Sequence, residues 1–174
     1  MDKIIFIYPV LIVALSAASF TDIQGGRIPN FITVPLMVAG LSFHTAVRGI
    51  DGLAFSAKGL GVGFGLLVLL YAVGGFGAGD VKLVAGTGSV LGPSAIVSAL
   101  FAATLLAGLC AIVLLGVRLG LSGSVKWLYS FLKMLLLLGG KPPSLPSDEK
   151  RVVLRYAPVF AVGTLASLVL FAVE

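Results

Sequence analysis

Most of this chain consists of apolar runs that are long enough, or nearly so, to cross a lipid bilayer as helices. Six such runs follow one another, at residues 4–20, 31–47, 53–73, 80–92, 95–117 and 153–173. A helix of about 17 to 25 apolar residues crosses the hydrocarbon core of a bilayer. Backbone polar groups find no water there and must pair within the helix. The runs therefore predict an all-α, polytopic membrane helix bundle with about six transmembrane helices.

The composition excludes an ordinary soluble domain. The 174 residues are 59% hydrophobic and only 11% charged, whereas soluble domains carry about 25% charged residues. The net charge of +5 does not indicate a nucleic-acid partner, because the basic residues are scattered at the ends of the apolar runs, where membrane topology places them. We expect a single transmembrane domain over residues 1–174, surrounded by membrane lipid and without a nucleic-acid partner.

A polar-edged segment at residues 118–152 separates the last two apolar runs. Its first part, VKWLYSFLKMLLLL, carries Lys126 and Lys133 along one face, which is typical of a helix that lies in the membrane interface. A seventh transmembrane helix is the alternative. The first run has a second interpretation too, because its small residues would suit a signal peptide. The N-terminal MDK has no net side-chain charge, which favours a retained helix.

The basic residues predict how the bundle is oriented. Seven of the twelve lysines and arginines lie within residues 118–155, and cytoplasmic loops of membrane proteins are enriched in these residues. We therefore place this segment in the cytoplasm. Counting back through the helices puts the N-terminus outside, and it puts residues 21–30 and 74–79 on the cytoplasmic side of the inner membrane.

Two carboxylates fall at the same depth in this topology. Asp22 follows the first run and Asp80 begins the fourth, so both are expected at the cytoplasmic boundary of the membrane. An ionisable residue in a helix bundle is costly to desolvate and is therefore a candidate for function. Structural roles are the alternative, with Asp80 as a helix cap and Asp22 as a loop residue. The other acids fall at the outer face or in the polar segment; they are Asp2, Asp51, Asp148, Glu149 and Glu174.

A pair of carboxylates that share one site suits peptide hydrolysis. Because both cannot ionise easily, one of them holds a proton towards neutral pH. One carboxylate can then take a proton from water while the other donates a proton to a carbonyl oxygen. This chemistry needs no metal ion or cofactor. Cys110 and His44 are the only cysteine and histidine, which argues against a zinc site or a Ser-His triad; we interpret them as a packing residue and an interfacial residue.

A small proton-coupled membrane transporter is the alternative function. Paired carboxylates in membranes also form proton relays. Transporter sites, however, lie near the middle of the bilayer and are often built from internal repeats. Asp22 and Asp80 are expected at one face, and the sequence has no internal repeat, so we favour hydrolysis.

Glycines and a lysine surround the second aspartate. Gly77 and Gly79 precede Asp80 and remove side chains where the backbone of a substrate would have to come close. A hinge between two helices is the alternative interpretation. Lys82 would act on the charge of the aspartates or on a substrate carbonyl, or it would extend to the cytoplasmic surface.

The first aspartate is followed by IQGGRIPN. Pro29 favours an extended Ile28 and can begin the next helix. Asn30 can cap that helix or form local hydrogen bonds. We interpret Arg27 as a determinant of membrane topology. Taken alone, this stretch is an ordinary loop that leads into a helix.

Together, TDIQGGRIPN and GAGDVKL resemble the paired motifs of the type IV prepilin peptidases, which are GxGD intramembrane aspartyl proteases. In that family one aspartate stands a few residues before Ile-Pro-Asn, and the other stands in Gly-x-Gly-Asp-x-Lys-Leu. The resemblance implies that Asp22 and Asp80 are the catalytic pair. RYAPVFAVG, at residues 155–163, looks like the last helix of the family. The residues that the resemblance assigns to the motifs around the pair are Ile28, Pro29, Asn30, Gly77, Gly79 and Lys82.

The resemblance also implies a substrate. Members of the family cut prepilins at the cytoplasmic face, after a glycine that ends a short basic leader. The long members carry an N-terminal extension with paired CxxC motifs and also methylate the new N-terminus. This chain starts at the first apolar run and has one cysteine, so it is similar to the short forms that serve tight-adherence, or Flp-type, pili; archaeal preflagellin peptidases are short as well. We expect a prepilin peptidase without N-methyltransferase activity.

Overall fold

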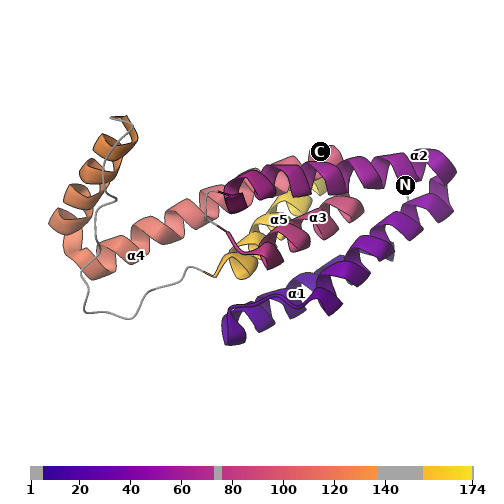
Figure 1. Cartoon of the computed structure of the whole chain (residues 1–174), viewed down its shortest axis with the longest axis horizontal. Helices are drawn as coiled ribbons and strands as arrows, with labels where there is room; N and C mark the ends of the chain where they lie inside the picture. The colour runs from indigo at the N-terminus through magenta and orange to yellow at the C-terminus, as the bar shows by residue number, and fades with distance from the viewer. Residues whose placement is uncertain (1–5, 73–75, 137–154, 174) are drawn as a thin grey trace. The chain divides into compact units, whose positions relative to one another are not determined.

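A computed structural model describes residues 6–72, 76–136 and 155–173, and all its elements in these ranges are helices (Figure 1). The all-α prediction is therefore confirmed. The helices are α1 (Tyr8–Gly25), α2 (Asn30–Ala72), α3 (Ala78–Leu91), α4 (Pro93–Leu136) and α5 (Tyr156–Val173). By clustering of contacts the chain divides into two compact units, Met1–Leu106 with Arg155–Glu174 and Ala107–Leu154.

Helix α2 is a hairpin that turns back at a single glycine. Gly49 has φ 61° and ψ −138°, a backbone conformation that residues with a side chain rarely adopt. The chain reverses there, so that residues 30–48 and 50–72 run in opposite directions away from the bend, with α3 between them (Figure 1). We call these two halves the first arm and the second arm of α2. They match the second and third apolar runs of the sequence.

Helix α3 packs against both arms of α2 at positions without large side chains. A Cβ atom added at Gly40 would overlap Ser89, and one added at Gly59 would overlap the Gly88 carbonyl oxygen. The backbones therefore lie in direct contact. Ser56 of the second arm adds a buried hydrogen bond, in which its hydroxyl donates to the Ser89 carbonyl at 2.6 Å. Small residues allow this close approach of helices inside a membrane.

The direction of α3 decides where the two aspartates lie. Gly40 of the first arm contacts Ser89 of α3, and His44, later in the first arm, contacts Val90, later in α3. Helix α3 therefore runs parallel to the first arm, and its N-terminus lies at the end where the first arm begins. That end is also where α1 stops, at Gly25. The fold thus brings residues 22–30 and 77–82 to one end of the bundle.

Helices α1 and α5 pack against each other and complete this compact unit. The buried face of α1 consists of Leu11, Leu15, Ala18 and Asp22. From α5, Ala157 and Phe160 are fully buried. The hydrophobic core is mostly aliphatic, with Phe160 and Tyr156 as its buried aromatic residues among those described.

The prediction of six separate transmembrane helices is not reproduced. Within the described residues, two helices are long and apolar enough to cross a membrane, Asn30–Ala72 and Pro93–Val113, and Tyr156–Val169 is a shorter apolar stretch. The second and third runs belong to one helical element that folds at Gly49. The fourth run forms a helix of 14 residues, which is too short to span a bilayer of about 30 Å at about 1.5 Å per residue. The described residues therefore support a helical membrane fold, but they do not show six spanning helices.

The predicted interfacial helix is not a separate element. Residues 124–136 belong to the same helical element as the fifth run, α4, although its ribbon bends sharply before its last part (Figure 1); a distinct helix was expected after the fifth run. The proline-rich remainder of the polar segment, residues 137–152, lies outside the described residues. The assignment of residues 1–174 to one domain stays a prediction beside the division into two compact units.

One minor prediction is wrong. Cys110 is exposed on α4 rather than packed, because the apolar surroundings in the sequence did not reveal which side of the helix faces the core.

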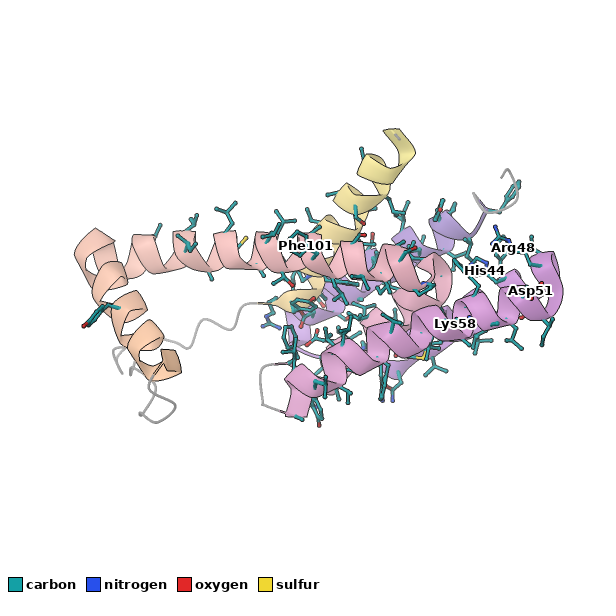
Figure 2. All side chains as sticks on the ribbon, turned by 90° about the horizontal axis from the view of Figure 1, so that it is seen from above. His44, Arg48, Asp51, Lys58 and Phe101 are labelled. Carbon is teal, nitrogen blue, oxygen red and sulfur yellow. The ribbon has the colours of Figure 1, made fainter. Side chains whose placement is uncertain are left out.

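His44 is fully buried, and its Nε2 atom donates to the Val90 carbonyl at 2.9 Å, beside the ring of Phe55. It lies near the bend of α2, with Arg48 and Asp51 (Figure 2). Its interfacial depth in the membrane stays a prediction.

Candidate active site

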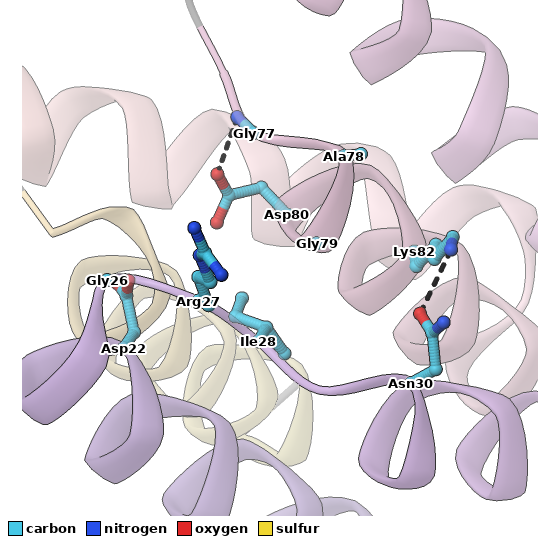
Figure 3. Close-up of a pocket in the computed structure, with 10 residues that line it drawn as sticks. All are labelled: Asp22, Gly26, Arg27, Ile28, Asn30, Gly77, Ala78, Gly79, Asp80 and Lys82. Carbon is cyan, nitrogen blue, oxygen red and sulfur yellow. Dashed lines mark hydrogen bonds between the residues drawn. The ribbon is translucent and has the colours of Figure 1, made fainter.

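Both predicted aspartates line one pocket at the end of the bundle. The pocket has a volume of about 340 Å³ (Figure 3). It is lined by Asp22, Gly26, Arg27, Ile28, Asn30, Gly77, Ala78, Gly79, Asp80 and Lys82. All the motif residues singled out in the sequence are in this lining except Pro29. Helices α1, α2 and α3 thus each bring part of the site.

Asp22 lies in the last turn of α1. It is therefore not a loop residue, which was the alternative role that the sequence analysis gave it. The helix continues to Gly25, where Gly26 adopts φ 62° and its N–H donates to the Asp22 carbonyl at 2.9 Å. Glycine suits this left-handed position at a helix end. Only 8% of Asp22 is exposed. The aspartate is therefore held on a rigid element.

The start of α5 holds Asp22 from the other side. The Ala157 N–H donates to Asp22 Oδ2 at 3.3 Å. The Arg155 guanidinium donates to the Asp22 carbonyl oxygen. One bond thus fixes the carboxylate, and the other fixes the backbone of the same residue. We refer to Arg155 and Ala157 as the α5 clamp.

Sequence reasoning missed the α5 clamp. The stretch RYAPVFAVG was noted only as similar to the last helix of a family, and no role was given to its first residues. Arg155 was counted only among the basic residues that predict orientation. The available signal was the predicted start of the last helix. Its first N–H groups are free and favour an anionic partner, and Arg155 adds a positive charge beside them.

Asp80 lies in the first turn of α3. Its Oδ2 atom accepts a hydrogen bond from the Gly77 N–H at 2.9 Å, which ties the carboxylate to the loop in front of the helix. Figure 3 shows the other carboxylate oxygen of Asp80 directed into the pocket. One oxygen is therefore anchored, and the second faces the space that the lining residues enclose.

Gly79, which precedes Asp80, leaves room for the loop between α1 and α2. A Cβ atom at Gly79 would lie 3.0 Å from the Ile28 Cβ and 3.3 Å from the Ile28 backbone nitrogen. These distances are tight for a real side chain. Gly79 therefore lets the α1–α2 loop come close to the start of α3. The sequence analysis expected such an approach from a substrate, and the structure has Ile28 at this place.

Burial and charge both act on Asp80, which lies outside the helices that are long enough to cross a membrane. Burial raises the pKa of its carboxyl above the ordinary value of 3.8, and the charge of Asp22 raises it further. The hydrogen bond from the Gly77 N–H opposes this shift because it stabilises the ionised form. The net direction is upward, so Asp80 retains its proton to a higher pH than a free aspartate does.

Two cations complete the lining of the pocket. Lys82 Nζ donates to Asn30 Oδ1 at 2.9 Å, which joins the first turn of α3 to the first turn of α2. In Figure 3 the Arg27 side chain extends into the space between Asp22 and Asp80. A positive group there offsets the repulsion between two carboxylates that share a site. In the described residues, no three His, Cys, Asp or Glu side chains are grouped to hold a metal ion.

For the peptide hydrolysis that the sequence motifs predict, replacing Arg155 with alanine is expected to lower kcat about tenfold, with little change in KM. The Asp22 carbonyl would lose a charged donor, and such hydrogen bonds contribute about 1.5–3 kcal/mol. Arg155→Lys keeps a charged donor for the Asp22 carbonyl and should therefore recover part of kcat. Lys58→Ala, at an exposed position on the second arm, is the control. Steady-state kinetics on the purified variants measure both constants, and an unchanged kcat in Arg155→Ala would contradict a positioning role.

The comparison with known protein families agrees with the motifs. Residues 9–112 match the sequence model of the type IV leader peptidase family. This range contains both pocket aspartates and covers more than half of the chain. The comparisons with curated proteins and with solved structures found no match. The resemblance seen in TDIQGGRIPN and GAGDVKL is confirmed at the level of the family: the chain belongs to the type IV leader peptidase family.

Proposed function

We propose that this protein is an aspartyl endopeptidase that removes the basic leader of type IV prepilins of the Flp-like class. The family match makes it a leader peptidase with a prepilin-type substrate. The observation that carries the aspartyl mechanism is that Asp22 and Asp80, far apart in the sequence, line the same pocket. Two carboxylates in one site can supply the general base and the general acid that hydrolysis of a peptide bond requires.

In the proposed reaction a water molecule attacks the carbonyl carbon of the scissile bond. Asp22 takes a proton from the water, and Asp80 donates its proton to the carbonyl oxygen, which gives a tetrahedral intermediate. Asp22 then gives the proton it took from water to the leaving nitrogen, while Asp80 takes a proton back from a hydroxyl of the intermediate. The C–N bond breaks, the carboxyl product and the new amine separate, and both aspartates return to their starting protonation states. The raised pKa of Asp80 supports its role as the first proton donor.

The hydrogen bonds of the two aspartates fit these roles. The Ala157 N–H holds one oxygen of Asp22, and the Gly77 N–H holds one oxygen of Asp80. In each carboxyl group the second oxygen is then available for proton transfer. Groups that are positioned before the substrate binds lose little freedom in the transition state, which favours catalysis.

The substrate must present an extended segment to this pocket, because the carbonyls of a helix are already hydrogen-bonded. We propose that cleavage follows a glycine at the cytoplasmic face of the inner membrane, with anionic lipid headgroups helping to bind the basic leader. A multi-pass bundle in one domain fits this placement. We also propose that the enzyme needs no cofactor and does not methylate the product. The transporter alternative receives no support from the family match.

Co-expression with a candidate Flp-type prepilin tests the proposal. We expect the prepilin to lose the mass of its leader only when the protein is present, and the new N-terminus to be unmethylated by mass spectrometry. An intact prepilin in the presence of folded enzyme, tested across several candidate substrates, would contradict the assignment. A methylated product would contradict the proposed restriction to peptidase activity.

The pKa of Asp80 gives a prediction for the pH dependence. Asp80 acts in its protonated form, so activity should fall as the pH rises through its raised pKa. Carbon-13 NMR of the Asp80 carboxyl in detergent should give a midpoint above 3.8. In Asp22→Asn the midpoint should move down, because the repelling charge is gone, and should stay above 3.8, because burial is the larger cause. An upward shift in that variant would show that the two carboxylates do not interact as described.

A further inference from the structure

A second hollow in the described residues is an apolar groove between α1 and the first arm of α2. Its volume is about 520 Å³. The lining contains no charged side chain and consists of Pro9, Val10, Val13, Ala14, Ala17, Ile32, Pro35, Leu36 and Ala39. None of these residues lines the carboxylate pocket. In a membrane such a groove is occupied either by lipid chains or by an apolar helix.

We propose that this groove binds the apolar helix of the substrate, the segment that directly follows the bond to be cut. The proposal rests on the proposed function, because it takes a prepilin as the substrate. The occupant is an apolar α-helix, which begins at the carboxylate pocket and extends away from it along α1 and α2. The pocket then acts on the bond, and the groove supplies most of the binding.

The position of the groove relative to the pocket supports this assignment. Ile32 lines the groove four residues after Ile28, which lines the carboxylate pocket. On α1, Ala17 lines the groove little more than one turn before Asp22. From Ala17 the groove continues to Pro9, which is about 12 Å along α1 at about 1.5 Å per residue. From Asp22 to Pro9 the distance is about 20 Å, which accommodates about 13 residues of a helix that begins at the pocket.

The lining suits a helix better than a lipid chain. Three of its residues, Ala14, Ala17 and Ala39, are small and partly buried. Small side chains let the backbone of a second helix come close, whereas a flexible acyl chain fills a surface of any shape. The groove thus has the composition of a helix-packing face that α1 and α2 leave open between them.

Pro35 adds a polar feature near the pocket. It lies inside α2 and lines the groove. Because proline has no N–H, it cannot donate the helical hydrogen bond to the carbonyl of Phe31, four residues earlier. The first N–H groups of a bound helix have no partner within that helix. The Phe31 carbonyl, one residue from Asn30 of the pocket, is an acceptor for such a group at the end where the substrate helix would begin.

Groove-filling variants test the proposal with two substrates. One is the full prepilin, and the other is a soluble peptide with the leader and only a few residues after the cut. For Ala17→Leu and Ala39→Leu we expect kcat/KM for the full prepilin to fall about tenfold, mainly through KM, while cleavage of the short peptide stays unchanged. Ala54→Leu, an equal change at an exposed position outside the groove, should leave both substrates unaffected.

Each other outcome is informative. If the groove variants cut both substrates like the wild type, the groove holds lipid and the proposal is wrong. If they lose both substrates equally, the change has damaged the catalytic pocket and the groove is not a separate binding surface. If the wild type cuts neither substrate, the proposed function itself fails, and this result is distinct from a failure of the groove proposal alone.

Disulfide cross-linking gives an independent measurement. Val13 is 69% exposed and lines the groove, so Val13→Cys in a Cys110→Ala background places one thiol there. A prepilin with a single cysteine in its apolar helix should cross-link to this position and not to Ala54→Cys in the same background. A cross-link between two copies of the enzyme instead would overturn the proposal in favour of a self-association surface, and no cross-link to the prepilin would contradict it.

Discussion

Replacing either Asp22 or Asp80 with asparagine is expected to abolish leader cleavage, with a loss in kcat of about 10³-fold or more. General acid–base catalysis contributes about 10² to 10⁴-fold in enzymes, and each partner of a pair is needed for the whole effect. The asparagine side chain has nearly the same shape as the aspartate side chain. It still accepts the hydrogen bond from the Ala157 N–H at position 22, or from the Gly77 N–H at position 80, so the fold should survive while proton transfer is lost.

The control for these variants is Asp51→Asn. Asp51 is exposed and lies next to the bend of α2, at the opposite end of the bundle from the pocket (Figure 2). The same chemical change there should leave the cleavage rate within about twofold of the wild type, as surface substitutions usually do. Mass spectrometry of the substrate measures all three variants. Cleavage that continues in both pocket variants would rule out the aspartyl mechanism.

Replacing Gly59 with alanine is expected to lower the free energy of unfolding by about 2–3 kcal/mol. The added methyl group would overlap the Gly88 carbonyl oxygen of α3. This neighbour is backbone and cannot rotate away, so the second arm and α3 must separate. Overpacking of this kind costs about 1–3 kcal/mol, which corresponds to a fall in Tm of roughly 5–10 °C for a chain of this size.

Gly61→Ala is the matched control for the packing effect. Gly61 lies two residues further along the same arm, and no atom lies within 4 Å of an added Cβ. Alanine is favoured over glycine in a helix by about 0.5–1 kcal/mol, so Tm should stay the same or rise slightly. Thermal unfolding in detergent measures both variants. An equal change in the two would show that helix propensity, rather than the contact with α3, decides the effect.

The helical class of the fold was predictable because long apolar runs leave the backbone no alternative in a membrane. The arrangement of the helices was less accessible. The bounds of the second and third runs, 31–47 and 53–73, predicted a break between them. They could not show that the chain turns at one residue, since the turn at Gly49 depends on its positive φ. The close packing of α3 between the two arms depends on contacts of Gly40, Gly59 and Gly88. In the sequence these three glycines look like any others.

The candidate site was predictable where side chains carry the chemistry. Asp22 and Asp80 stood out because acids are scarce in this chain. The α5 clamp did not stand out. The hydrogen bond that holds the Asp22 side chain comes from the backbone N–H of Ala157, and a backbone group leaves no trace in the residue types. The contact also joins positions 135 residues apart, and no local pattern connects them.

The α5 clamp has a consequence for biosynthesis. The ribosome finishes Asp22 and Asp80 long before it reaches Arg155 and Ala157, which follow only after the polar segment. A nascent or truncated chain that ends before residue 155 therefore contains both acids but lacks the donors that α5 supplies to Asp22. Assembly of the proposed hydrolytic centre is coupled in this way to completion of the polypeptide, and premature termination products would carry both motifs without the finished geometry.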